Sequence, residues 1–171
     1  MIKNTLSTFR ALFSSVHWFE IRKKKFNYKK KQTVGKLIVI KSYSELKTRN
    51  FKSYFNKFPL KINRFKKNFC FLVLASNDKK KILCSGWLYK GTSWKVTEVN
   101  KKVKLNNSIL LFDFLTPKKF RNKGYYKKIL ELIVYKNLGK KLAIYSLSNN
   151  VKSLKAIKKA GFKLKRKIYG I

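Results

Sequence analysis

Acidic residues, cysteine and histidine are all scarce in this chain of 171 residues. It contains six Asp and Glu residues, two Cys and one His, and the two cysteines do not form a C-x-x-C pair. These shortages argue against a disulfide framework and against a zinc module. We therefore predict a protein of a reducing compartment, the cytoplasm, that needs no metal ion.

Long apolar runs are also missing. The longest, Phe69 to Ala75 and Ile109 to Leu115, fall far short of the roughly 18 residues that a membrane-spanning helix needs. A membrane-spanning protein is therefore excluded. A disordered basic tail is excluded as well, because 44% of the residues are hydrophobic and 15% are aromatic. The length suits one domain with its own core and is short for two.

Positive charge, by contrast, is abundant. The chain has 44 Lys and Arg residues and a formal net charge of +38. A field of this sign attracts polyanions and other anionic partners. AT-rich codon usage would explain the excess of Lys over Arg, but it would not explain the shortage of acidic residues. Codon bias and function therefore both remain open as causes of the charge.

Residues 1–32 are predicted to form a basic amphipathic N-terminal arm. Apolar residues recur at helical spacing from Leu6 to Phe19, and a basic run from Arg22 to Lys31 follows. Such an arm would lie on an anionic membrane surface, bind nucleic acid, or pack on its own domain or a partner. The first of these would make the protein peripheral at the membrane. The segment lacks the uninterrupted apolar core and cleavage site of a secretory signal.

Residues 33–171 are predicted to form one mixed α/β (α+β) domain, because strand and helix patterns alternate along them. Strands are predicted over 36–40, 69–76, 81–89, 108–116, 141–147 and 162–169, and helices over 45–56, 123–138 and 150–160. The 69–76 and 81–89 strands should form an antiparallel hairpin in which Cys84 faces Val73. The strands at 108–116 and 141–147 should be parallel, because the helix between them requires a crossover connection.

One segment runs from a strand through a turn directly into a helix and is the best candidate for a site. The strand contains Asp113, and the turn contains Arg121, Lys123 and Gly124. At a helix start, backbone N–H groups lack internal partners and point outward at the positive end of the dipole, which makes a cradle for phosphate. Gly124 would let a phosphate approach the backbone, and the basic side chains add charge.

Two short patterns resemble the Gcn5-related N-acetyltransferase (GNAT) family over about Phe69 to Tyr169. The first is Arg121-Asn-Lys-Gly124-Tyr-Tyr, where the family has Q/R-x-x-G-x-G/A. The second is Asn150-Val-Lys-Ser153, where the family has N-x-x-A/S followed by a closing Gly-Phe. The resemblance implies a mostly antiparallel central sheet with one parallel pair of strands that splay apart and with flanking helices. It also implies that an acetyl group passes from acetyl-CoA directly to a primary amine, without a metal ion.

The resemblance also assigns roles to residues of this chain. The cofactor-binding residues would be Leu115, Thr116, Arg121, Asn122, Lys123, Gly124, Tyr125, Tyr126, Asn150 and Ser153. Backbone N–H groups of 122–126 would hold the diphosphate, and the N–H of Leu115 or Thr116 would polarise the thioester carbonyl. Asp113 lies where many members have the general base that takes the proton of the amine. The alternative is an acid that is simply paired with a Lys or Arg.

Two positions depart from the family pattern. Tyr126 stands where Gly or Ala is usual, which would narrow the phosphate cradle or turn its loop differently. Ile157 stands where the family often has a Tyr that protonates the departing thiolate, so water or another hydroxyl, such as that of Tyr145 or Ser153, would have to serve. Trp87, Tyr89 and Trp94 either line an acceptor pocket or belong to the core.

The variant of the first pattern in this chain, Arg121-Asn-Lys-Gly124-Tyr-Tyr, is similar to the pattern in the branch of the family found with cell-surface glycan synthesis. This implies an amino sugar, free or nucleotide-linked, as the amine acceptor, and a basic surface would suit an anionic acceptor of this kind. The same surface would suit RNA. The alternatives are a catalytically silent module of this fold that binds nucleic acid or anionic membrane, and an acetyltransferase acting on an RNA- or ribosome-linked amine.

Overall fold

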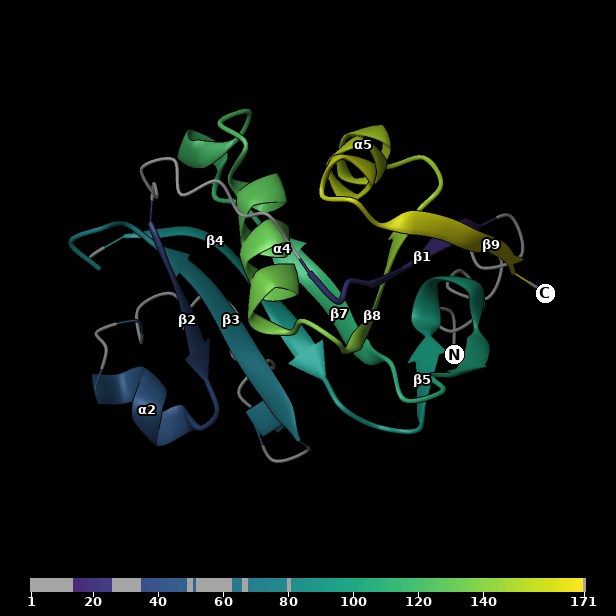
Figure 1. Cartoon of the computed structure of the whole chain (residues 1–171), viewed down its shortest axis with the longest axis horizontal. Helices are drawn as coiled ribbons and strands as arrows, with labels where there is room; N and C mark the ends of the chain where they lie inside the picture. Colours follow the sequence, from purple (N-terminus) through teal and green to yellow (C-terminus); the bar gives the residue numbers. More distant parts are fainter. Residues whose placement is uncertain are drawn as a thin grey trace, which may run out of the picture.

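The computed structural model describes residues 14–25, 35–48, 51, 63–65, 68–79 and 81–170, which build a seven-stranded sheet with helices on both sides (Figure 1). The strands are β1 Ser15–Arg22, β2 Lys36–Ile40, β3 Phe69–Ala75, β4 Ile82–Tyr89, β5 Ser93–Val96, β6 Lys101–Lys104, β7 Ile109–Leu115, β8 Lys141–Leu147 and β9 Lys163–Tyr169. The α-helices are α2 Tyr43–Thr48, α4 Tyr125–Lys136 and α5 Val151–Lys159, and the 3-10 turns are η2 Thr97–Val99 and η3 Lys118–Phe120.

The strand order in the large sheet is β2-β3-β4-β7-β8-β1-β9. Every neighbouring pair is antiparallel except β7 and β8, which are parallel across the α4 crossover. The predicted mixed, mostly antiparallel sheet with one parallel pair is therefore confirmed. β5 and β6 form a separate two-stranded sheet. Within the described ranges, the structure has no helix with the length and apolarity needed to cross a bilayer.

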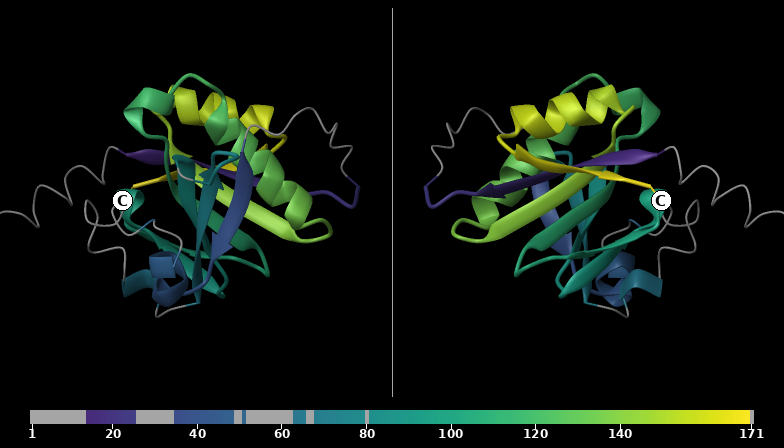
Figure 2. Two further views of the ribbon diagram at one scale, coloured as in Figure 1. Left: turned by 90° about the vertical axis from the view of Figure 1, so that its left-hand side faces the viewer. Right: turned by 90° about the vertical axis from the view of Figure 1, so that its right-hand side faces the viewer.

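The helix expected up to Phe19 is wrong, because Ser15–Arg22 forms the strand β1. This segment lies in the sheet between β8 and β9, and Figure 2 shows it crossing beside β9. Val16 and Trp18 are buried on one face, and Phe19 and Ile21 are buried on the other. A strand with apolar residues on both faces does not alternate with polar residues, so its spacing is easily taken for that of a helix. Residues 1–13 and 26–32 of the predicted arm lie outside the described residues.

The β3–β4 hairpin is confirmed, but its register differs from the prediction by one residue. Cys84 pairs with Leu74 and not with Val73, because the ladder skips Leu83 between the Cys84 and Ile82 pairs. This bulge near the turn could not be read from the turn length alone. Cys70 faces Leu88, and both cysteines are free thiols.

Helix α2 begins two residues earlier than predicted, because Ser42 caps its N-terminus. The Ser42 hydroxyl accepts a hydrogen bond from the Glu45 N–H (3.2 Å), and the Glu45 carboxylate accepts one from the Lys41 N–H (2.9 Å). The helix is described as far as Thr48. Most of the remaining predicted helix, to residue 56, lies outside the described residues.

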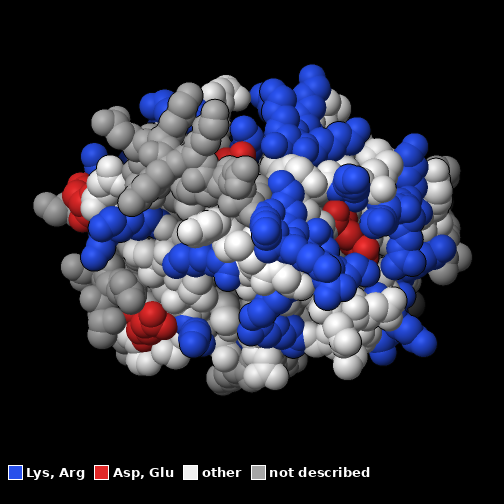
Figure 3. Space-filling view, viewed as in Figure 1, with Lys and Arg blue, Asp and Glu red and all other residues white. Residues whose placement is uncertain are grey.

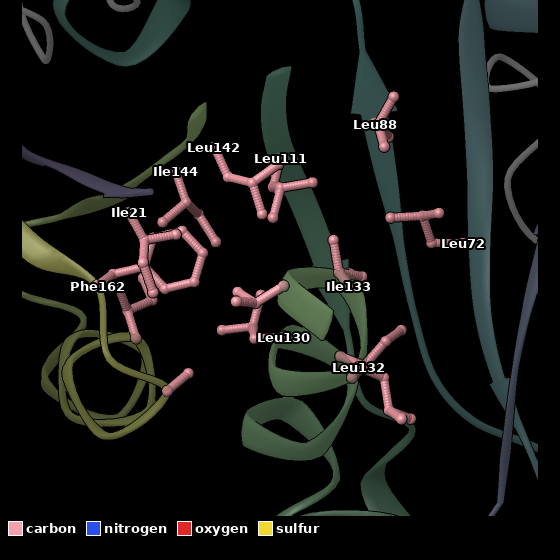
Figure 4. Close-up of a cluster of buried hydrophobic side chains, with 14 of the residues drawn as sticks. Ile21, Leu72, Leu88, Leu111, Leu130, Leu132, Ile133, Leu142, Ile144 and Phe162 are labelled. Carbon is pink, nitrogen blue, oxygen red and sulfur yellow. The ribbon is translucent and has the colours of Figure 1, made fainter. Parts of the chain in front are cut away.

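Two apolar clusters, one on each face of the sheet, fix the surrounding elements. One face is covered by α4 and α5, whose Leu130, Ile133 and Ile157 pack on the sheet; Figure 4 shows part of this cluster. The other face is covered by Leu46 of α2 and by residues from η2 and β6, such as Val99 and Val103. α4 follows β7 through residues 116–124, which include η3, and α5 follows β8 through residues 148–150, so both helices begin on the side where the carboxyl ends of these strands lie.

Candidate functional site

The parallel strands β7 and β8 part halfway along their length (Figure 1). Their ladder joins only Ile109–Leu111 to Leu142–Ile144, although the strands continue to Leu115 and Leu147. Beyond the ladder each strand presents its backbone and side chains to a cavity of about 1290 Å³. A cavity of this size accommodates a ligand larger than a typical drug molecule.

Ten of the eleven residues that the sequence assigned to the site line this one cavity. They are Asp113, Leu115, Thr116, Arg121, Asn122, Gly124, Tyr125, Tyr126, Asn150 and Ser153. Lys123 belongs to the same turn, but its side chain is exposed and does not line the cavity. The structure therefore brings two motifs, separated by about 25 residues, around one space, while the roles of these residues remain predictions.

The start of α4 is an open helix N-terminus. The chain turns through left-handed conformations at Asn122 (φ 61°) and Gly124 (φ 75°), and Gly124 caps the helix without any side-chain hydrogen bond. A Cβ placed on Gly124 would have no heavy atom within 4 Å. The Arg121 Nε donates to the Thr116 carbonyl (3.2 Å) and ties this turn to the end of β7. The first N–H groups of α4 thus face open space, which fits a diphosphate.

The start of α5 shows what the second motif does structurally. The Asn150 side-chain oxygen accepts a hydrogen bond from the Ser153 N–H (3.2 Å), so Asn150 is the N-cap of α5. The Ser153 hydroxyl in turn donates to the Tyr126 hydroxyl (3.3 Å) and links α5 to α4. The N-x-x-S pattern therefore fixes the position of α5 beside the cavity.

Tyr126, which departs from the family pattern, is turned toward β7 and α5. Its ring packs on Phe114 with 5.3 Å between centroids, and its hydroxyl meets Ser153. Burial raises the pKa of Tyr126 well above its usual value. Phe114 reaches this position by leaning over Gly86 of β4, where any Cβ would overlap its ring. The large residue is therefore accommodated as part of the cavity wall.

Basic side chains gather on the α4 and α5 side of the cavity. Arg121, Lys127, Lys152, Lys155 and Lys159 all line the cavity. Figure 3 shows that Lys and Arg dominate the face formed by α4 and α5, with few acidic side chains among them. The positive helix dipoles and these cations act in the same direction, so this end of the cavity favours an anionic group such as a diphosphate.

Asp113 lies at a bulge in β7, on the opposite side of the sheet from α4. Ser85 pairs with Leu115 and Trp87 with Phe112, so Asp113 and Phe114 together oppose one residue of β4. Asp113 takes a left-handed conformation there (φ 53°), and its carboxylate forms an ion pair with Arg64 (Oδ2 to Nη1, 2.7 Å). Bulges of this type re-aim a side chain next to a site.

Arg64 is a cavity residue that no sequence pattern singles out. Its guanidinium lies over the rings of Trp87 (5.3 Å) and Phe112 (5.1 Å) in addition to its ion pair with Asp113. The two partners of the ion pair are 49 residues apart in the chain. No local spacing encodes such a contact, because it depends on how distant segments fold together.

A tyrosine, a tryptophan and a second carboxylate complete this end of the cavity. The Trp94 indole N–H donates to the Tyr145 hydroxyl (3.3 Å), and both residues line the cavity together with Glu98. Burial, and then the negative charge of Glu98, raises the pKa of Tyr145 to about 12. Trp94 is therefore a lining residue, whereas Trp87 is 1% exposed and belongs to the core. Glu98 was not anticipated from the sequence.

Ile157, which stands where the family often has a tyrosine, lies outside the cavity. Its side chain is fully buried in the cluster beneath α5 and does not line the cavity. Any side-chain proton donor for a departing thiolate must therefore come from another position, such as Ser153 or Tyr145, which both line the cavity. Among the described residues, no group of three or more His, Cys, Asp or Glu side chains is placed to hold a metal ion.

Tyr145 is expected to ionise late in an alkaline titration. The folded state favours its neutral form, so the stability that this group contributes is complete below pH 10, the ordinary pKa, and is lost as the pH rises through about 12. Tyrosinate absorbance at 295 nm should show one fewer late-ionising phenol in Tyr145→Phe than in the wild type. Tyr169→Phe, which removes a phenol that is 60% exposed, is the control for the substitution itself. An unchanged late phase in Tyr145→Phe would contradict the prediction.

Comparison with solved structures finds proteins of the same fold at low sequence identity. An acetyltransferase of the GNAT family from Colwellia psychrerythraea superposes with a TM-score of 0.54 and 16% identity, over 89% of this chain and 53% of that chain. A functionally unknown conserved protein from Staphylococcus epidermidis ATCC 12228 gives 0.57 and 10%, over 91% and 59%. A GCN5-related N-acetyltransferase from Sphaerobacter thermophilus gives 0.50 and 8%, over 91% and 50%.

The chain therefore has the GNAT fold, as the two sequence motifs predicted. At identities of 8 to 16% the likeness shows a shared fold and not a shared reaction. This chain spans 50 to 59% of the length of these three proteins. The sequence matches no protein-family model, and no curated protein matches it in sequence. The glycan-synthesis branch remains a prediction.

Proposed function

We propose that the protein is an N-acetyltransferase that takes the acetyl group of acetyl-CoA and transfers it to a primary amine. The observation that carries the proposal is the gap between β7 and β8, which opens toward both faces of the sheet. Gly124 and Tyr126 lie on the side of α4, whereas Asp113 and Tyr145 lie toward the face covered by β5 and β6. A donor and an acceptor entering from the two sides would meet between the strands.

The donor side would hold acetyl-CoA, which supplies an activated acetyl thioester. The first N–H groups of α4, Arg121 and the lysines of α4 and α5 would bind its diphosphate, because this end of the cavity combines helix dipoles with basic side chains. The backbone N–H of Leu115 or Thr116, at the end of β7, would stabilise negative charge that develops on the carbonyl oxygen.

On the acceptor side, one residue accepts a proton and another donates one. Asp113 accepts the proton that the amine loses as its nitrogen bonds to the acetyl carbon. Tyr145 remains protonated because its pKa is about 12, and its oxygen already accepts a hydrogen bond from Trp94. Its own O–H is therefore free to donate toward the sulfur as the carbon–sulfur bond breaks, in place of the tyrosine missing at position 157.

We further propose an amino sugar, free or nucleotide-linked, as the acceptor class and the cytoplasm as the location. The support is the sequence resemblance and the partly exposed ring of Trp94 in the cavity, which offers an apolar surface to a sugar. Most of the basic run from Arg22 to Lys31 lies outside the described residues. Its binding to anionic membrane or nucleic acid therefore remains a prediction from the sequence.

A thiol-release assay tests the proposed reaction. Acetyl-CoA is incubated with the protein and with amino sugars, nucleotide-linked amino sugars, polyamines, peptides or aminoacyl-tRNA, and free CoA thiol is measured. We expect amine-dependent release with at least one class, together with a rise in Tm on adding acetyl-CoA. No release with any amine, combined with nucleic-acid binding that falls steeply with salt, would instead favour the catalytically silent module.

A further inference from the structure

We propose that the acceptor carries an anionic group, a carboxylate or a phosphate, close to its reactive amine, and that Arg64 binds this group. The inference rests on the proposed function and narrows its substrate class to amines with an adjacent anion. It starts from the ion pair between Arg64 and Asp113, since both side chains line the cavity.

Arg64 is held in place by two aromatic rings as well as by Asp113. Its guanidinium lies over Trp87 and Phe112, which are 1% and 4% exposed and therefore form a fixed apolar platform. The side chains of Arg64 and Asp113 nevertheless stay 31% and 35% exposed. A ligand in the cavity can therefore reach both charges, and the planar guanidinium is suited to binding a carboxylate or a phosphate through two hydrogen bonds.

The charges at this end of the cavity favour an acceptor with both signs. An ammonium group that approaches Asp113 also approaches the Arg64 guanidinium, only 2.7 Å from that carboxylate, and is repelled by it. An anionic group beside the amine reverses this balance, because it faces Arg64 while the ammonium faces Asp113. Each charge of the acceptor then faces a protein charge of the opposite sign.

Binding of such an acceptor also prepares Asp113 for its role as base. The anion of the acceptor replaces the Asp113 carboxylate as the partner of Arg64, so carboxylate oxygens become available to the amine. Glu98, the second acid of this region, lies near enough to Tyr145 to raise its pKa, as does Asp113. The amine therefore enters a region flanked by two carboxylates, in a protein with only six acidic residues.

The experiment compares small amines of similar length that differ in their second group. The probes are ethanolamine (neutral), β-alanine (carboxylate), O-phosphoethanolamine (phosphate) and 1,3-diaminopropane (cationic), each tested by thiol release with acetyl-CoA. We expect kcat/KM for β-alanine or O-phosphoethanolamine to exceed that for ethanolamine by about tenfold to a hundredfold, the effect of one charge-assisted hydrogen-bonded contact. The better of the two anionic probes identifies the anion. Equal rates, or a preference for the diamine, would overturn the inference.

Variants of Arg64 separate substrate binding from a purely structural ion pair. Arg64→Gln should reduce the preference for the anionic probe over ethanolamine by about tenfold to a hundredfold, chiefly through KM, and Arg64→Lys should restore part of it. Arg166→Gln is the matched control, because Arg166 also lies over a tryptophan ring (Trp18, 5.8 Å) but does not line the cavity. If Arg64→Gln lowers both rates equally, Arg64 does not select the substrate.

Calorimetry distinguishes failure of the acceptor inference from failure of the proposed reaction. If no amine releases thiol, the acetyltransferase proposal fails, but binding of β-alanine and of O-phosphoethanolamine to the CoA-saturated protein still decides the acceptor inference. Binding that is present in the wild type and in Arg166→Gln and weakened in Arg64→Gln supports it. Absence of binding in the wild type, or equal binding in Arg64→Gln, overturns it.

Discussion

Replacing Gly124 with Asp is expected to abolish the stabilisation of the protein by acetyl-CoA. At a concentration a hundred times Kd, acetyl-CoA should stabilise the wild type by about 2.7 kcal/mol, which corresponds to a Tm increase of about 5 to 10 °C at this chain length. A carboxylate at the start of α4 would face the diphosphate and lower the affinity by at least about a hundredfold. The remaining stabilisation would then be about 0.4 kcal/mol, or about 1 °C, in a thermal melt.

Gly139→Asp is a closely matched control for this substitution. Gly139 follows the other end of α4, has nearly the same backbone conformation (φ 78° against 75°), and also leaves open space, with no heavy atom within 4 Å of where a Cβ would lie. Both substitutions add the same charge and similar backbone strain, but only one lies at the cavity. Gly124→Asn adds the same volume without the charge and should retain more of the shift. Equal shifts in Gly124→Asp and Gly139→Asp would contradict a phosphate cradle at α4.

The part of the site that could be predicted lies in continuous stretches of sequence. The turn from Arg121 to Gly124 and the cap from Asn150 to Ser153 are each local, since their geometry depends on the backbone conformation of a few neighbouring residues. Each motif also lies in the connection that follows a strand, so a parallel pairing of β7 and β8 brings both to one edge of the sheet. The two motifs and the family resemblance that they carry were therefore enough to predict ten of the residues that line the cavity.

The part that could not be predicted depends on contacts between distant segments. Arg64 meets Asp113 across 49 residues, and Trp94 meets Tyr145 across 51. The strand β1 pairs with β8 and β9 along its two edges and is buried on both faces by the two apolar clusters, and this tertiary setting overrides its helix-like spacing. The acceptor side consists largely of such contacts, whereas the donor side consists largely of local turns. The structure therefore adds more information about the acceptor side of the cavity than about the donor side.

Replacing Asp113 with Asn is expected to slow acetyl transfer by about a hundredfold to ten-thousandfold, the usual contribution of a positioned general base. The fold should be retained, because Asp113 occupies a left-handed backbone conformation (φ 53°) that Asn adopts readily. The lost ion pair with Arg64 is about one-third exposed and contributes no more than about 1 kcal/mol. The Tm increase with acetyl-CoA should remain that of the wild type, since Asp113 lies away from the start of α4.

The division of the effect between kcat and KM gives the sharper test of this role. Asp113→Asn removes the carboxylate that faces the ammonium group but leaves Arg64 to hold the anionic group, so kcat should fall much more than KM rises. Asp78→Asn removes the same charge in the turn between β3 and β4, away from the cavity, and is the matched control. If kcat in Asp113→Asn stays within a few-fold of the control, Asp113 is not the base. A larger loss in Glu98→Gln than in Asp113→Asn would assign the proton transfer to Glu98, the other carboxylate that lines this end of the cavity.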